Sequence, residues 1–81
     1  MSSIMLDKEN ILTQFGKSLK EARLSKAVSQ EDLALTIGFD RTYISLLERG
    51  KRNPSLFAIC EISQQLEVQP SDLMPSLKIK K

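Results

Sequence analysis

The sequence has no histidine and no tryptophan, and its only cysteine is Cys60. A single cysteine excludes a disulfide within the chain, and the lack of histidine removes the commonest metal ligand and the commonest general base. No convincing pair of carboxylates replaces them, so the sequence predicts no enzyme activity, no metal and no cofactor. Aromatic residues make up only 5% of the chain. The core must therefore come from Leu, Ile and a few Phe, and neither a large cavity nor a small-molecule ligand is expected.

Long apolar runs are also missing. No stretch approaches the roughly 18 apolar residues that a membrane-spanning helix requires. The apolar segment Ser3–Leu6 is too short for the core of a signal peptide and follows no basic leader. We therefore expect a cytoplasmic protein without membrane contact.

The chain length favours one domain. Eighty-one residues split in two would give pieces that each bury too little surface to offset chain entropy. We expect a single domain over residues 1–81 with an ordered core over about 8–77, while residues 78–81 fray.

Basic charge gathers in one segment. The net charge is +2, but residues 41–52 alone carry +3. Such a patch on a nearly neutral body is as often a solvated surface as a nucleic-acid site.

Apolar spacing and capping residues predict five short helices and no strand. Short polar side chains that cap helix N-termini occur at Asp7, Ser29, Asp40 and Ser55. The predicted helices cover about 8–25, 30–37, 41–48 and 56–66, followed by a short helix that begins at residues 70–71 and carries Leu73, Met74 and Leu77.

The second and third predicted helices have the features of a helix-turn-helix. Ala34 permits a close helix crossing, Gly38 suits the turn, and Ile44 and Leu47 anchor the second helix beneath a polar outer side. An ordinary helical hairpin is the alternative interpretation.

Over about residues 11–77 the chain resembles the phage-repressor-like, Xre- or Cro-type helix-turn-helix family, and within it the controller proteins of restriction-modification systems. The resemblance is carried by Phe15–Leu19, Ser29–Ala34, Gly38, Asp40–Ser45 and Glu48–Leu56. It implies an all-α, five-helix, lambda-repressor-like domain that binds double-stranded DNA and regulates transcription.

The resemblance also implies site roles. Residues expected to read bases are Arg41, Thr42, Ser45, Leu46 and Arg52; residues expected to hold the DNA backbone are Gln30, Tyr43, Arg49, Lys51 and Asn53. The chemistry is suitable, because the planar guanidinium of Arg41 matches the acceptors of guanine in the major groove. Surface solvation is an equally good explanation for Arg49 and Lys51. By the same resemblance, Arg23 and Glu48 form an ion pair. This pair is expected to fix the angle of the predicted helix over 41–48, the recognition helix that would enter the DNA groove.

The sequence departs from the family pattern at two positions. Ala27 stands where the turn between the first two helices usually has glycine, so either the turn differs or alanine adopts a left-handed conformation. Phe57 occupies an outward position that is usually polar. Together with Leu73, Met74 and Leu77 it suggests an apolar patch for homodimerisation, with core packing as the alternative. Cys60 is expected to be a small buried residue.

The sequence thus predicts a homodimeric transcription regulator that binds a pseudo-palindromic operator, most specifically a restriction-modification controller. A phage-type repressor or an antitoxin autorepressor is the alternative, although fewer than ten residues follow the last predicted helix to hold a toxin. A protein-interaction module without DNA binding is a more distant third.

Overall fold

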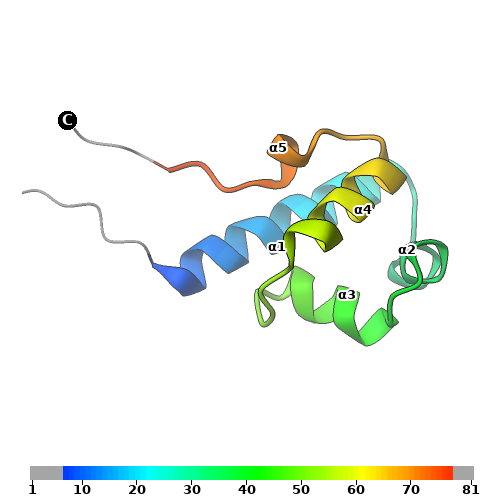
Figure 1. The fold of residues 1–81 in the computed structure, drawn as a ribbon, viewed down its shortest axis with the longest axis horizontal. Coiled ribbons are helices and arrows are strands. Elements are labelled where there is room, and N and C mark those ends of the chain that lie inside the picture. The colour runs from blue at the N-terminus through cyan, green and yellow to red at the C-terminus, as the bar shows by residue number, and fades with distance from the viewer. Residues whose placement is uncertain (1–6, 78–81) are drawn as a thin grey trace, which may run out of the picture.

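The computed structural model describes residues 7–77, which form helices without any strand (Figure 1). The helices are α1 Lys8–Ser25, α2 Gln30–Ile37, α3 Arg41–Glu48, α4 Leu56–Leu66 and α5 Pro70–Leu73. The all-α, five-helix prediction is confirmed. Residues 4–6 and the tail 78–81, where fraying was expected, lie outside the described residues. No helix in the described part is long and apolar enough to cross a membrane.

Each of the first four helices begins directly after the cap residue expected from the sequence. Asp7, Ser29, Asp40 and Ser55 have extended backbones, and each side chain accepts a hydrogen bond from a backbone N–H in the following turn. These bonds satisfy donors that an α-helix leaves unpaired at its start. The helix starts are therefore set by local chemistry.

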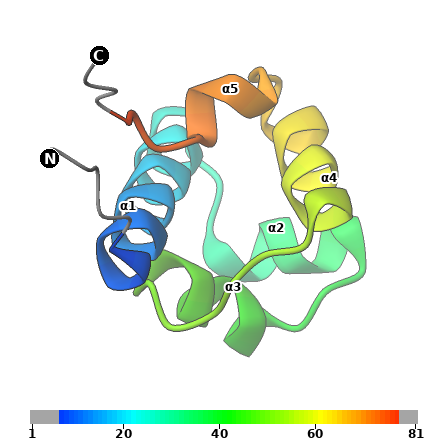
Figure 2. The ribbon, with the colours of Figure 1, turned by 60° about the vertical axis from the view of Figure 1, so that its left-hand side comes forward.

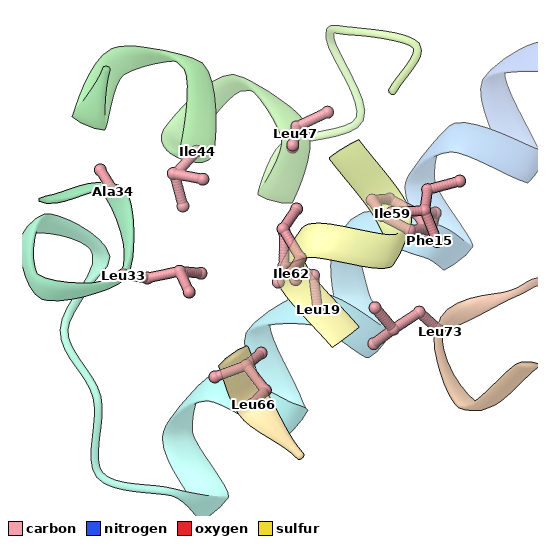
Figure 3. Packing of buried hydrophobic residues seen from close by; sticks show 10 residues of the cluster. All are labelled: Phe15, Leu19, Leu33, Ala34, Ile44, Leu47, Ile59, Ile62, Leu66 and Leu73. Carbon is pink, nitrogen blue, oxygen red and sulfur yellow. The ribbon is translucent and has the colours of Figure 1, made fainter. Parts of the chain in front are cut away.

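The helices surround one apolar core (Figure 2). Helix α1 packs against α3 and α5, α2 against α3 and α4, and α4 against α5. Figure 3 shows side chains from all five helices converging: Phe15, Leu19, Leu33, Ala34, Ile44, Leu47, Ile59, Ile62, Leu66 and Leu73. Because α1 and α2 pack against α3, with Ile44 and Leu47 buried, the third helix has one buried and one open side.

The last helix differs from the prediction. It ends at Leu73, and Met74 is extended, with a ψ of 146°. Pro75 follows directly, and the residue before a proline avoids helical geometry because of a clash with the proline ring. Leu73 is fully buried between α1 and α4 rather than part of an exposed patch (Figure 3).

One expectation about α4 is also wrong. Cys60 is exposed, because the buried side of α4 consists of Ala58, Ile59, Ile62, Ser63 and Leu66. Leu56, which shares helical spacing with that buried side, is 77% exposed at the first position of the helix. Cys60 thus lies on the open side of α4, whereas Leu56 precedes the stretch of the helix whose side chains are buried.

Candidate nucleic-acid interface

The turn between α2 and α3 has the geometry of a helix-turn-helix. Ala34 is buried where the helices approach, and Gly38 ends α2 with a φ of 75°. Glycine takes this left-handed conformation without strain. The backbone N–H of Phe39 then donates to the Ala34 carbonyl over 2.8 Å, and Asp40 caps α3. The two predicted roles of Ala34 and Gly38 agree with this geometry.

Helix α3 presents a polar outer side. Ile44 and Leu47 are completely buried and hold the helix against the core. Arg41 and Thr42 are exposed at its first two positions, and Ser45 and Leu46 are half-buried farther along. In Figure 1, α3 and the loop that follows it lie on the side of the molecule away from α5.

The structure contains the expected ion pair between α1 and α3. Arg23 Nε donates to Glu48 Oε2 over 2.6 Å, and Nη2 donates to Oε1 over 3.0 Å. Nη1 donates to the carbonyl of Val28 over 2.8 Å. Both charged side chains are more than 90% buried. This bidentate arrangement connects the end of α3 to α1 and to the turn before α2.

The same carboxylate also holds Gln30, which the sequence interpretation left free for DNA. Gln30 Nε2 donates to Glu48 Oε1 over 3.0 Å. A side-chain amide carries two N–H donors, so one remains for a phosphate oxygen. The side chain is thus oriented by α3 while it lies at the N-terminus of α2.

Tyr43 lies on the flank of α3 rather than along its exposed side. Its ring is half-buried and meets Phe39 edge to face, with centroids 5.3 Å apart and planes at 82°. The guanidinium of Arg52 lies over the Tyr43 ring, 5.3 Å from its centroid. The packing of Phe39 against Tyr43 was not anticipated from the sequence.

The loop after α3 extends the basic surface. Gly50, with a φ of 71°, turns the chain, and exposed side chains follow at Lys51, Arg52 and Asn53. Within residues 7–77 the ion pairs are Arg23–Glu48 and Lys26–Glu67. None of the four basic side chains of residues 41–52 therefore pairs with a described acidic group.

The turn between α1 and α2 resolves the question posed by Ala27. Its φ is 57°, so alanine adopts the left-handed conformation in which the family pattern has glycine. The next N–H, of Val28, returns to the Arg23 carbonyl over 3.1 Å.

Exposed apolar side chains also lie on α4 and after α5. Leu56, Phe57, Met74 and Leu77 are 77%, 67%, 49% and 51% exposed. A hollow of about 80 Å³ lies between α1, the start of α4 and the segment after α5; it is lined by Ile11, Leu12, Phe15, Asn53, Pro54, Ile59, Met74 and Pro75.

Comparison with known proteins gives a consistent result. A helix-turn-helix family model matches residues 19–73. The control protein C.BamHI of Bacillus amyloliquefaciens is 52% identical over 66 residues, covering 80% of this chain and 82% of that protein. The control protein C.MunI of a Mycoplasma species is 41% identical over 70 residues, covering 85% and 95%.

Solved structures agree. The restriction-modification controller protein C.AhdI from Aeromonas hydrophila superposes with a TM-score of 0.75 at 43% identity, covering 78% of this chain and 96% of that chain. The controller protein C.Esp1396I, solved as a tetramer with its natural 35 base-pair operator, gives 0.69 at 39% identity, covering 76% and 82%. With its Ala34–Gly38 turn and its open third helix, this chain belongs to the helix-turn-helix family that includes these controller proteins.

Proposed function

We propose that this chain is a sequence-specific DNA-binding regulator of transcription that inserts α3 into the major groove. The observation that carries the proposal is the orientation of α3. Ile44, Leu47 and the Glu48 carboxylate hold one side of the helix, which leaves Arg41 and Thr42 exposed at its N-terminal end. Recognition helices of this class read base edges with their N-terminal residues.

The assignment of roles follows from this docking. The base-reading group is Arg41, Thr42, Ser45, Leu46 and Arg52, and the backbone-holding group is Gln30, Tyr43, Arg49, Lys51 and Asn53. The second amide N–H of Gln30 and the unpaired backbone N–H groups at the start of α2 suit a phosphate oxygen. The Arg23–Glu48 pair fixes the angle between α3 and the body of the protein.

The relatives make the regulatory role more specific. C.AhdI and C.Esp1396I are controllers of restriction-modification systems, and C.Esp1396I assembles on an operator. We propose the same role here, with binding to a pseudo-palindromic operator in the cytoplasm. A restriction endonuclease gene and a methyltransferase gene beside this one would support it.

A homodimer fits the apolar surface. Leu56, Phe57, Met74 and Leu77, with the hollow beside Met74, form what we call the α4–α5 surface. If a second copy of the chain makes a two-fold symmetric contact here, the same side chains of both copies are removed from water. The buried Leu73 does not contribute to this surface.

Selection from a random-sequence duplex library tests the function. We expect enrichment of a palindromic motif, with two half-sites separated by about one turn of DNA. Affinity should fall steeply as salt rises, because several phosphates are neutralised. A protein-interaction module without DNA binding would enrich nothing. A phage-type repressor would enrich a motif as well but would lack the neighbouring restriction and methyltransferase genes.

A further inference from the structure

Two of the four arginines, Arg23 and Arg52, are held in different ways. Arg23 is buried, and Glu48 and the Val28 carbonyl occupy donors on all three of its nitrogens. Arg52 is exposed in the loop after α3 and makes no ion pair with any acidic residue of 7–77. Its guanidinium instead lies over the face of Tyr43, at a distance within cation–π range.

The two arrangements leave different chemistry available. A carboxylate partner uses up N–H donors, as Glu48 does for Arg23. An aromatic face attracts the positive charge through its π-electrons and occupies no N–H group. The stacked guanidinium of Arg52 therefore keeps its five donors free for base edges or phosphates.

The Tyr43 ring is itself fixed. Tyr43 occupies the third position of α3, and its backbone N–H donates to the Asp40 carbonyl over 3.0 Å. Phe39 supports the ring from the turn before the helix. The ring is thus rigidly related to Arg41 and Thr42, its neighbours in the first turn of α3.

From this arrangement we propose that Tyr43 is the positioning residue for Arg52. Through the Phe39–Tyr43–Arg52 stack, a loop arginine is held beside the base-reading end of α3 before DNA arrives. Holding a long flexible side chain in advance reduces the entropy lost on binding. The proposal rests on the proposed function for its DNA readout, whereas the stack itself is a property of the free protein.

A double-mutant cycle on the selected duplex tests it. Arg52→Ala should lower affinity for the duplex selected by the wild type about tenfold. The same substitution should have an equal effect in a Tyr43→Phe background, where the ring remains, but an effect below about twofold in a Tyr43→Leu background. Thermal unfolding of Arg52→Ala should match the wild type, because an exposed loop side chain contributes little to the fold.

Equal tenfold effects of Arg52→Ala in all backgrounds would overturn the proposal. If Tyr43→Leu does not fold, the wild-type protein supplies the test. Its Arg52 δ protons should show upfield ring-current shifts and contacts to the Tyr43 ring in the DNA-free NMR spectrum. Random-coil shifts for the Arg52 δ protons would overturn the stack even when DNA binding is intact. A protein that selects no duplex would overturn the proposed function, and the NMR result could still be read.

Discussion

Gly16 of α1 lies directly against the backbone of Glu48 at the end of α3. A Cβ atom added to Gly16 would stand 2.5 Å from the backbone carbonyl oxygen of Glu48 and 2.8 Å from its carbonyl carbon. The Leu47 oxygen would also be overlapped. These neighbours are backbone atoms and cannot rotate away. The absence of one side chain therefore sets how closely α1 approaches the recognition helix.

Gly16→Ala should destabilise the fold despite the better helix propensity of alanine. Propensity favours alanine by about 1 kcal/mol, whereas forced movement of backbone in a packed interior costs roughly 1–3 kcal/mol. Urea unfolding should show a net loss, and DNA affinity should fall because α3 shifts. Lys17→Ala, at the exposed neighbouring position, is the control and should change stability by less than about 0.5 kcal/mol. A Gly16→Ala protein as stable as the wild type would contradict the close contact.

Glu48→Ala should be severely destabilising. It leaves the buried Arg23 guanidinium without its carboxylate, and removal of one partner from a buried pair costs about 3–5 kcal/mol. It also frees the Gln30 amide. The double variant Arg23→Met with Glu48→Met should lose less stability than Glu48→Ala, since no unpaired charge remains. Chemical unfolding of both variants measures this, and a Glu48→Ala loss below 1 kcal/mol would argue against a tightly coupled pair.

Ala27→Gly should stabilise the protein or leave its stability unchanged. Ala27 adopts a φ of 57°, a conformation that costs alanine about 1–2 kcal/mol, and the greater freedom of glycine in the unfolded chain offsets up to about 1 kcal/mol of the relief. We expect a net gain between about 0 and 1.5 kcal/mol from these two terms. Ala22→Gly, within α1, should do the opposite. A lower melting temperature for Ala27→Gly would show that the turn is not left-handed.

Arg41→Ala should relax base preference at one position of each half-site. A bidentate arginine–guanine contact discriminates by about 1–3 kcal/mol, and the exposed Arg41 side chain has no described acidic partner that would compete for it. Site selection with the variant measures the preference. Lys20→Ala, which removes an exposed charge from α1, should leave the selected motif unaltered. If Arg41→Ala selects the same motif as the wild type, Arg41 does not belong to the base-reading group.

Phe57→Glu should convert the proposed homodimer into a folded monomer. The exposed Phe57 side chain lies in the α4–α5 surface, and an isologous contact would bring the two introduced charges together near the two-fold axis. Analytical ultracentrifugation measures the assembly. Operator binding should weaken strongly although no DNA-contacting residue changes, because the recognition helices lose their separation of about 34 Å. Gln64→Glu is the control, because it adds a charge at an exposed position of the same helix and should leave the assembly unchanged. A Phe57→Glu protein that remains a dimer would place the interface elsewhere.

Local features of the sequence determined the helices. The capping side chains at Asp7, Ser29, Asp40 and Ser55 act within a few residues, and Gly38 permits a left-handed turn whatever surrounds it. Such interactions need no tertiary partner. The helix starts and the turn between α2 and α3 were predictable for this reason.

Tertiary packing decided which side chains are buried at the ends of helices. Leu73 fills the space between α1 and α4, whereas Leu56, at the first position of α4, stays exposed although it shares helical spacing with the buried side of that helix. Helical spacing specifies which residues share a side but not how far a neighbouring helix extends. The Gln30–Glu48 bond and the Tyr43–Arg52 stack likewise join residues separated by 18 and 9 positions. Only the folded chain brings their groups within reach, so no local pattern in the sequence could reveal them.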